Sequence, residues 1–578
     1  MNPERLLQNF DRLINTPDAV PRLRRFILDL AVRGKLVEQN PEDEPAAELL
    51  KRIEAEKKRL INNGVIRVPK SYELLNETEP LFNLPKTWKW VRLCDVGSII
   101  GGGTPPSKDE SCFTVGGKGI AWLTPADLGK HDDLFISHGA RDLTEKGLAT
   151  SSARLMPAGS VLFTSRAPIG YTAIAANKIS TNQGFKSVLP YVSESNRYIA
   201  VYFNAFASWI DSKASGTTFR EVSGKIVANL PFPLSPIAEQ HRIVAKVEEL
   251  MKLCDELEAE QAKRERRRNR LVAATLHGLN NGKVDNRNDE SLSFEDSARF
   301  YFNHLPRLTT RPEHIQQLRQ TILNLAVRGK LVPQDPKDEP AEKLLMRIEN
   351  EKKRLVKSGA IKEAKPLSQI KVAEMLFIAP AGWKWTRLSD SVNSHLGGGT
   401  PSKGNATYWN GDIFWASVKD IGKTKYVDQT MDRITQAGLE NSSSNLIPPG
   451  NLIVVTRMGL GKVSINRVPM AINQDLRALF LSSLTEIDYY YIFFKTASYE
   501  GKGLTVKGIK VEELLNFPFP LPPLAEQHRI VAKMYELMTL CDELETRVTT
   551  DITTNRKFLE VTLQEALSGA NYGEEAIL

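Results

Sequence analysis

The segment LAVRGKLVEQNPEDEPAAELLKRIEAEKKRL, residues 30–60, returns as LAVRGKLVPQDPKDEPAEKLLMRIENEKKRL at residues 325–355, with 24 of the 31 positions identical. A second segment, PFPLSPIAEQHRIVAKVEELMKLCDELE at 231–258, returns at 518–545 with 23 of 28 positions identical. The two stretches that lie between these copies share only sparse motifs. A duplicated frame that holds two diverged inserts predicts a molecule that makes two similar but non-identical recognitions.

The first repeated segment predicts a pair of helices. Residues 23–37 carry apolar side chains at helical spacing until Gly34 interrupts them, and residues 45–61 begin with a proline and are rich in strong helix formers. The same two helices are expected near 312–328 and 340–356.

The second repeated segment predicts a long helix over 238–272, which would span on the order of 50 Å at 1.5 Å per residue. Its copy carries the same apolar phase from Ile530 to Val548. The polar residues 278–297 predict a linker between the halves. In the first of these long helices, the apolar positions alternate in steps of four and three residues, as in a coiled coil. They are Ile243, Val247, Leu250, Cys254 and Leu257.

The two inserts predict β-rich domains. Each opens on a Trp-x-Trp strand, WKWVRL at 88–93 and WKWTRL at 383–388, and continues into GGGTP at 101–105 and 397–401. Apolar strands, Pro/Gly turns and an Asn-Gln pair follow in both. The helices expected within the inserts are 198–213 and 489–499.

The order of elements predicts an α+β chain. We expect two β-rich recognition domains, separated by long antiparallel coiled-coil helices and related by a pseudo-two-fold internal repeat. If the N-terminal helices fold against the C-terminal helix, the chain ends rebuild a copy of the middle. The predicted divisions are 1–84 (helical), 85–235 (first recognition domain), 236–379 (central helical region), 380–523 (second recognition domain) and 524–578 (long helix).

The charge distribution favours a polyanionic partner. The chain of 578 residues has 77 basic and 69 acidic residues, a net charge of +8. Residues 85–235 contain 16 basic and 11 acidic residues, and residues 380–523 contain 15 basic and 12 acidic residues. The rest of the chain therefore contains 46 of each kind. All the excess therefore lies in the inserts, where phosphate binding would place it, although such excesses also arise by chance.

The location expected from the sequence is the cytoplasm. No apolar run approaches the ~18–20 residues that cross a bilayer, and the N-terminus lacks a signal-peptide core. The four cysteines show neither CxxC nor metal spacing, which indicates reduced thiols and no metal site.

Taken together, these features resemble the specificity subunit of type I restriction–modification systems, over essentially the whole chain. The resemblance rests on the paired W-x-W…GGGTP openings, the P-x-G…[TS]R…G segments at 155–170 and 446–461, the NQ pairs and the segment PFPLPPLAEQHRIV. Ser235 and Ile237 depart from the second copy, which has Pro522 and Leu524.

The resemblance implies a function for every part of the chain. Each insert would be a target recognition domain that reads one half of an asymmetric bipartite site in double-stranded DNA. The helices would set the gap and dock two methyltransferase subunits, with restriction subunits as an optional partner. The chain itself would be non-catalytic and carry no cofactor, because S-adenosylmethionine, ATP and magnesium belong to the partners.

The candidate DNA contacts come from polar residues at equivalent places in the two inserts. An arginine after a β-branched strand can bind guanine or phosphate, or simply form a surface salt bridge. The amides of the Asn-Gln pairs could read adenine or hydrogen-bond within a turn. In each insert, a threonine and a lysine follow a glycine run that is expected to be flexible. The candidates are Thr104, Lys108, Arg166, Gln183, Arg220, Thr400, Lys403, Lys419, Arg457, Gln474, Lys502 and Lys507.

Other prominent residues have a structural interpretation. The tryptophans of the W-x-W strands are expected to pack rather than to stack on bases. His241 and His528 begin the long helices without a catalytic partner nearby, and a helix-end or subunit contact is expected. Cys254 and Cys541 lie on the apolar seam. The basic run KRERRRNR at 263–270 is expected to be a solvated or partner-facing surface.

Two rival functions compete with DNA reading. NLPF at 229–232 and NFPF at 516–519 superficially resemble the Asn/Asp-Pro-Pro-Tyr/Phe motif of amino-methylating enzymes, which would make the chain a stand-alone DNA adenine methyltransferase. Their second position is wrong for that motif, and no glycine-rich cofactor loop follows an early strand. A coiled-coil DNA-binding scaffold would explain the helices but not two basic β-rich inserts. GGGTP lacks the Gly-Lys-Ser/Thr of a P-loop.

Overall fold

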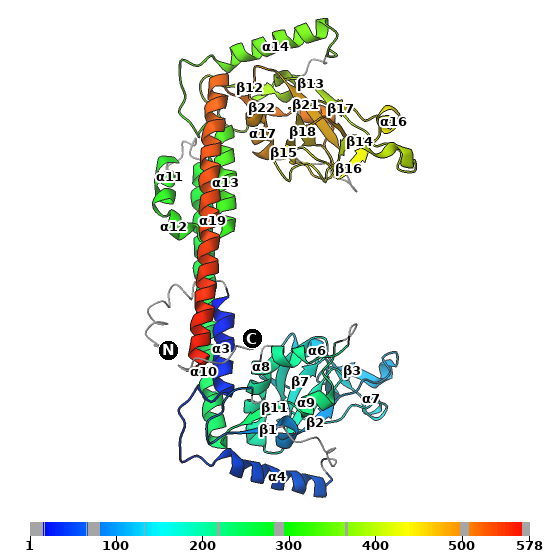
Figure 1. Ribbon diagram of the computed structural model, residues 1–578, viewed down its shortest axis with the longest axis vertical. Coiled ribbons are helices and arrows are strands. Elements are labelled where there is room, and N and C mark those ends of the chain that lie inside the picture. Colours follow the sequence, from blue (N-terminus) through cyan, green and yellow to red (C-terminus); the bar gives the residue numbers. More distant parts are fainter. Residues whose placement is uncertain are drawn as a thin grey trace. The chain divides into compact units, whose positions relative to one another are not determined.

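The computed structural model divides the chain into two compact units (Figure 1). Unit 1 comprises Met1–Arg264 and Ile552–Leu578, and unit 2 comprises Glu265–Asp551. Each unit contains one β-rich domain and parts of the long helices, so the predicted α+β fold with two β-rich domains and long helices is confirmed. The structure describes residues 16, 18–64, 66, 81–131, 133–216, 220–281, 294–363, 368–496 and 508–568.

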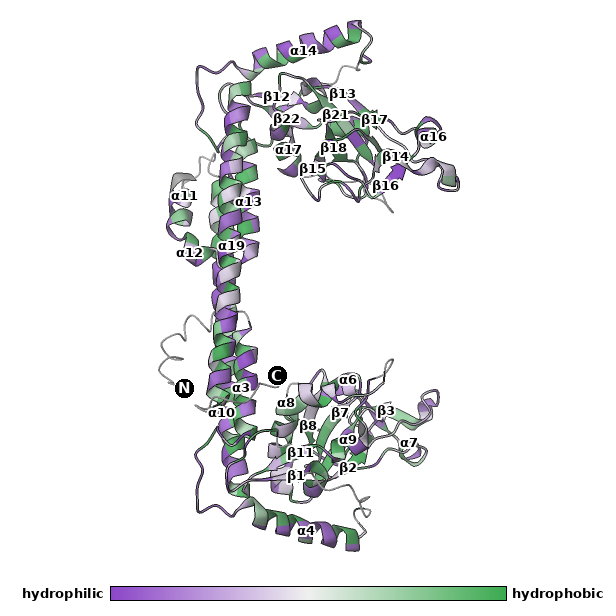
Figure 2. Cartoon of the chain, viewed as in Figure 1, coloured by the Kyte–Doolittle hydropathy of each residue, from purple (hydrophilic) through white to green (hydrophobic). Residues whose placement is uncertain are grey.

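The predicted helical pairs are present in both units. Unit 1 contains α3 (Ala19–Val32) and α4 (Ala46–Asn62), and unit 2 contains α13 (Pro312–Val327) and α14 (Ala341–Lys357). Gly34 follows α3 with φ of +67°, a backbone conformation that side chains disfavour, and a Cβ atom there would lie 2.5 Å from Cγ of Pro85. Hydrophilic and hydrophobic residues alternate along α4 and α14 (Figure 2), as expected of helices with one buried face.

The first of the two long helices exceeds its predicted length. α10 (Ile237–Asn281) and α19 (Leu524–Ser568) each contain 45 residues. α10 thus extends past the predicted end at residue 272 and into the predicted linker, which is further shortened by α11 (Phe294–Asn303). α11 and the short α12 (Leu305–Leu308) were not predicted from the sequence.

In unit 1 the apolar seam of α10 is buried. Ile243, Val247 and Cys254 are all less than 9% exposed and belong to one core with residues of α3 and the β-rich domain. Arg24 of α3 holds the outer edge of this contact through Asp255, at 2.5 Å, and Glu258, at 3.0 Å. The seam therefore packs against the duplicated short helix and the recognition domain of its own unit.

The end of the C-terminal helix completes unit 1. Leu559 and Leu563 of α19 form a small core with Ala19 of α3. Two ion pairs border it, Arg22 with Glu560 at 3.4 Å and Arg556 with Asp18 at 3.1 Å. The condition stated from the sequence, that the N-terminal helices fold against the C-terminal helix, is thus met by α3.

Unit 2 builds the same arrangement from different parts of the chain. Arg319 of α13 contacts Asp542 at 2.7 Å and Glu545 at 2.8 Å on α19, the counterparts of the Arg24 contacts. The seam residues Ile530, Met534 and Cys541 are buried in a core that also contains Val272, Leu276 and Leu279 from the end of α10. In unit 2 the end of α10 thus takes the place that the end of α19 has in unit 1.

The recognition domain of unit 1 consists of three sheets and a covering helix, α8 (Asn196–Ser212). Phe203 of α8 stacks on Phe163 with ring centroids 4.3 Å apart, which fixes the helix on the largest sheet. The first sheet has the strand order β2 (Gly97–Gly101), β10 (Lys186–Pro190), β7 (Val161–Ser165), β8 (Ile169–Ala175), β5 (Phe135–Ile136). The second sheet has the order β3 (Phe113–Val115), β6 (Arg141–Leu143), β4 (Ile120–Leu123), β9 (Ser180–Thr181). The third sheet consists of β1 (Lys89–Arg92) and β11 (Pro231–Leu234).

The recognition domain of unit 2 also has sheets of five, four and two strands, with α17 (Ile487–Thr496) in the place of α8. The five-stranded sheet has the strand order β13 (Val392–Gly397), β21 (Leu476–Leu481), β18 (Leu452–Val455), β19 (Val463–Asn466), β15 (Tyr426–Val427). The four-stranded sheet has the order β16 (Asp432–Ile434), β14 (Trp409–Ala416), β20 (Met470–Ile472), β17 (Leu446–Ile447). The two-stranded sheet consists of β12 (Lys384–Arg387) and β22 (Pro518–Leu521). Short helices in the two domains are α5 (Leu93–Val96), α6 (Pro125–Leu128), α7 (Glu145–Ala149), α9 (Gly224–Ala228), α15 (Leu388–Ser391), α16 (Gln436–Glu440) and α18 (Val511–Leu515).

The duplicated AEQHR sequence joins each domain to its long helix. In unit 1, Glu239 accepts hydrogen bonds from Nε1 of Trp88 at 2.8 Å and from Nε2 of Gln39 at 2.5 Å. Glu526 of unit 2 accepts from Trp383 and Gln334, each at 2.8 Å. Burial raises the pKa of both carboxyl groups. The glutamate, tryptophan and glutamine of the repeats are therefore structural.

The acidic turns make a second joint beside the first. Arg242 binds Asp43 of NPEDEP at 2.7 Å, and Arg529 binds Asp338 of DPKDEP at 2.6 Å. One carboxylate of each turn is consequently used inside its own unit.

Candidate nucleic-acid interface

Both recognition domains carry the same threonine–glutamine contact. Oγ1 of Thr104 donates a hydrogen bond to Oε1 of Gln183, and Oγ1 of Thr400 donates to Oε1 of Gln474. The two glutamines are exposed. The structure thus brings together predicted residues that lie 79 and 74 positions apart in the sequence.

The glycine run before each threonine is closely packed and not flexible, which corrects the sequence-based interpretation. A Cβ atom on Gly102 would lie 2.0 Å from the carbonyl oxygen of Asn182, and one on Gly398 would lie 1.7 Å from that of Ile472. These glycines are needed because the loop passes directly against the strand that leads to the glutamine, not because the loop must approach a ligand.

A buried tryptophan fastens each glycine run from the other side. Nε1 of Trp122 donates to the carbonyl oxygen of Gly103 at 3.0 Å, and Nε1 of Trp415 donates to that of Gly399 at the same distance. These two tryptophans were not predicted from the sequence. The alignment of IAWL with IFWA would have identified them as a repeated feature.

The two residues of each Asn-Gln pair have different tasks. Oδ1 of Asn182 accepts the backbone N–H of Gly184 at 2.8 Å, and Oδ1 of Asn473 accepts that of Asp475 at 3.1 Å. The asparagines therefore stabilise a turn. Only the glutamines are left at the surface of that turn, available to a ligand.

Arg166 lies in the same cluster in unit 1. Its Nη1 is 3.8 Å from Oε2 of Glu221, and the other carboxylate oxygen accepts from Nζ of Lys186 at 2.9 Å. Lys186 also donates to the backbone oxygen of Gln183 at 3.3 Å. Thr104, Gln183, Lys186, Glu221 and Arg166 form one continuous polar cluster. Lys186 and Glu221 were missed because a single sequence does not reveal pairing between distant loops.

Arg457 of unit 2 also has a carboxylate partner, but from another position. Its Nη1 is 3.5 Å from Oδ1 of Asp475, the residue after Gln474. Arg166 and Arg457 form backbone bridges with Glu221 and Gly508 respectively, so Gly508 occupies the place of Glu221. The salt-bridge alternative from the sequence is thus real for both arginines. The side chains of Arg166 and Arg457 remain partly accessible, at 35% and 49% respectively.

The residue after each arginine has an unusual backbone conformation. Ala167 has φ of +46° and Met458 has φ of +60°, a region that residues other than glycine rarely occupy. Met458 is also 60% exposed. Strained positions of this kind concentrate at ligand-binding sites.

The remaining candidates lie around these clusters. Lys108 and Lys403 are exposed in the loops that follow the threonines, and Lys419 is exposed in the turn after β14. Arg220 binds Asp211, with Nη2 2.8 Å from the backbone oxygen and 3.3 Å from Oδ2. Lys502 and Lys507 lie outside the described residues.

The tryptophans of the two W-x-W strands pack within their domains, as expected, and several residues of the long helices have contacts in the described part of the chain. Trp88 and Trp383 are buried, and Trp90 and Trp385 pack on phenylalanines at 4.9 and 4.8 Å between ring centroids. Nδ1 of His528 lies 3.0 Å from Oε2 of Glu486. In the basic run, Lys263 contacts Glu260 at 3.0 Å, and Nε of Arg268 donates to the backbone oxygen of Arg307 at 3.0 Å.

The sequences NLPF and NFPF are structural elements. Pro231 and Phe232 belong to β11, which pairs with β1, and Phe232 is fully buried. Oδ1 of Asn229 accepts from Nη1 of Arg92. The second copy forms the equivalent pair of β22 with β12. Neither copy presents a methyl-transfer motif to a ligand.

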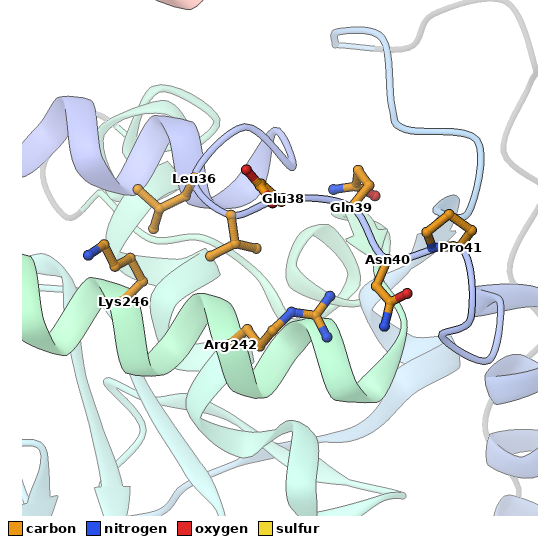
Figure 3. A pocket seen from close by; sticks show the side chains of 8 residues that line it. Leu36, Glu38, Gln39, Asn40, Pro41, Arg242 and Lys246 are labelled. Carbon is orange, nitrogen blue, oxygen red and sulfur yellow. The ribbon is translucent and has the colours of Figure 1, made fainter.

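A polar groove of about 600 Å³ lies in unit 1 between residues 36–41 and α10 (Figure 3). Its lining includes Gln39 and Arg242, which are bonded to Glu239 and Asp43 respectively. Internal contacts therefore occupy these two polar groups of the groove. Within the described ranges, no group of three or more His, Cys, Asp or Glu side chains is arranged to bind a metal ion. No described helix combines the length and apolar character that a membrane span requires.

Comparison with known proteins identifies the class. The family model for the type I restriction modification DNA specificity domain matches twice, at residues 85–265 and 380–554, more than half of the chain. The type I restriction enzyme EcoEI specificity subunit of Escherichia coli is 31% identical over 92% of this chain and 91% of its own length. The EcoAI specificity subunit of the same species is 32% identical over 91% and 90% respectively.

The chain belongs to the family of type I restriction–modification DNA specificity subunits. It is accordingly a DNA-reading, non-catalytic subunit, and the stand-alone methyltransferase alternative is set aside. A solved HsdS subunit from Thermoanaerobacter tengcongensis aligns over 86% of this chain and 100% of its own, at 19% identity and a TM-score of 0.41.

Proposed function

We propose that residues 85–235 and 380–523 are two target recognition domains, each of which reads one half of an asymmetric bipartite site in double-stranded DNA. The observation that carries this proposal is the recurrence of one exposed Thr–Gln–Arg cluster in both domains, within surroundings that differ between them. Unlike surroundings favour unlike half-sites, and hence an asymmetric target.

The DNA contacts follow from the chemistry of the clusters. Gln183, Gln474, Arg166 and Arg457 can reach base edges, because amide and guanidinium groups match the donor and acceptor patterns of the major groove. Lysines around a cluster contribute sequence-independent phosphate contacts. The proposed contacts to phosphate are Lys108, Lys403, Lys419, Arg220, Lys502 and Lys507, with Thr104 and Thr400 beside the glutamines.

The helical regions 1–84, 236–379 and 524–578 are proposed to set the gap between the half-sites and to dock two methyltransferase subunits. Helices of 45 residues are about 68 Å long at ~1.5 Å per residue, and one turn of DNA is about 34 Å. Restriction subunits are an optional further partner. S-adenosylmethionine, ATP and magnesium are proposed to bind to the partners, and the complex to act in the cytoplasm.

The test is base-by-base methylation of the genome in a host that expresses this chain together with its neighbouring methyltransferase. Deletion of the chain is expected to abolish methylation at a single asymmetric bipartite motif while other methylation continues. Unchanged methylation after deletion would contradict the proposal and would favour the DNA-binding scaffold.

A further inference from the structure

The two recognition domains share one rigid element, which we call the Thr–Gln cradle: the loops 102–104 and 181–183 in unit 1, and 398–400 and 472–474 in unit 2. In both, a backbone hydrogen bond joins the loops, from the N–H of Gly103 to Thr181 at 2.8 Å and from that of Gly399 to Ile472 at 3.0 Å. Together with the glycine contacts, the tryptophan bonds and the asparagine turns described above, it holds the glutamine backbone in one conformation.

The threonine limits the freedom of the glutamine side chain as well. An amide oxygen has two lone pairs and the amide nitrogen carries two hydrogens. The threonine hydroxyl engages one lone pair of Oε1 in each domain. One lone pair of this oxygen and the N–H groups of the amide nitrogen remain for a ligand, and these are the groups that a bidentate contact needs.

That arrangement selects one base. Adenine presents a donor at N6 beside an acceptor at N7, which one amide satisfies with its oxygen and its nitrogen. Guanine presents two acceptors, cytosine a single donor, and thymine an acceptor with a methyl group. The amide therefore matches the adenine of an A·T pair.

The surroundings of the cradle differ between the domains. Gly184, Lys186 and Glu221 in unit 1 stand where unit 2 has Asp475, Arg477 and Gly508. An element that is kept while its neighbours change has a task that both half-sites share, whereas the neighbours account for the differences.

We propose that Gln183 and Gln474 each read the adenine of an A·T pair, so that both half-sites contain one at the equivalent place, and that Thr104 and Thr400 are positioning residues for these amides. This inference rests on the proposed function, because it assumes that the two domains read DNA.

The test uses the full chain in complex with its methyltransferase subunits, once the methylated motif is known. Methyl-transfer rates are measured on duplexes in which every base pair of the motif is replaced in turn. Gln183→Ala is expected to relax discrimination at one A·T pair of one half-site, on the order of 5- to 150-fold, and to leave the other half-site unchanged. Gln474→Ala is expected to do the converse, so each domain is the control for the other.

The positioning role has its own readout. Thr104→Val and Thr400→Val, which remove only the hydroxyl, are expected to relax discrimination at the same A·T pair as the corresponding glutamine variant, and to a smaller extent. Thr104→Ser and Thr400→Ser restore the hydroxyl and are expected to restore discrimination. If serine fails to restore what valine removes, the threonines do not position the amides.

Two further results would overturn the inference. One is a uniform loss of rate on all duplexes in the glutamine variants, since that is the signature of a structural or phosphate contact. The other is relaxation at a G·C pair. Both differ from failure of the proposed function itself, in which the wild-type complex would methylate no bipartite motif.

Discussion

Arg166 and Arg457 each lie beside a carboxylate, supplied by Glu221 in unit 1 and by Asp475 in unit 2, at positions that are not equivalent. A nearby carboxylate weakens attraction to phosphate but orients the planar guanidinium group. That the pairing is formed in two ways indicates that orientation matters, which favours contact with a base edge over contact with the backbone.

Substitution of the arginine by lysine separates these two kinds of contact. Arg457→Lys keeps the charge and loses the bidentate fork, so we expect a loss of about 1–3 kcal/mol of discrimination at one base pair of a single half-site. Measurement of binding by the complex to single-base variants of the target, at one salt concentration, checks this. Unaltered discrimination in the lysine variant would assign Arg457 to phosphate.

The Glu239 carboxyl at the joint between helix and domain predicts a pH dependence. Burial raises its pKa above the ordinary value of 4.5, so the folded chain retains this proton over a pH range in which the unfolded chain has lost it. The stability that it contributes is therefore fully present below pH 4.5 and is lost as the pH rises through the folded-state pKa.

Glu239→Gln removes that titration. The quantity to measure is the difference in melting temperature, wild type minus variant. We expect this difference to be greatest near pH 4.5 and to decrease toward pH 7. Glu526→Gln is expected to behave alike, because its pKa is raised by the same cause. Glu256→Gln, an exposed change on the same helix as Glu239, is the control. A difference that grows with pH would contradict the assignment.

At the scale of elements, the seam of each long helix is what attaches it to its unit. Ile243 and Ile530 are fully buried, while Leu253 and Leu540 on the same helices are both 52% exposed. We expect Ile243→Ala and Ile530→Ala to lower the free energy of unfolding by about 2–5 kcal/mol. The matched changes Leu253→Ala and Leu540→Ala should stay within about 0.5 kcal/mol.

Chemical denaturation of the full chain measures these four variants. A chain of several domains need not unfold in two states. The measurement is therefore the shift of the transition midpoint for each variant, compared between the buried and exposed substitutions and between the two copies of the long helix. Equal effects of the buried and exposed substitutions would show that the seam is not the contact surface.

At the scale of the molecule, the two ends of the chain meet in unit 1. α3 packs on Leu559 and Leu563 of α19. These two leucines lie after Asp551, the last residue of α19 that belongs to unit 2. A chain that ends at Asp551 should keep unit 2 but expose Ala19 and its neighbours. We expect faster hydrogen exchange in α3 and no change in α13, the counterpart of α3 in the same molecule. Equal acceleration in both helices would contradict this assignment of the chain ends to unit 1.

The helices could be predicted from the sequence because their hydrogen bonds are local and their apolar period is visible along the chain. The boundaries were less accurate. α10 continues to Asn281 through the polar sequence that was interpreted as a linker, and its final residues Val272, Leu276 and Leu279 are stabilised by burial within unit 2. Packing against distant parts of the chain extended this helix beyond its own periodic signal.

The duplication of the chain is visible in its sequence alone, as are the bounds of the repeats and the polar residues that recur in the inserts. Which of these polar residues meet is set by the tertiary structure. Thr104 reaches Gln183, Arg166 reaches Glu221 while Arg457 reaches Asp475, and the glycine run proved to be packed instead of flexible. The reason is that contacts between strands and loops join residues far apart in the chain, and one sequence carries no periodic signal for that pairing.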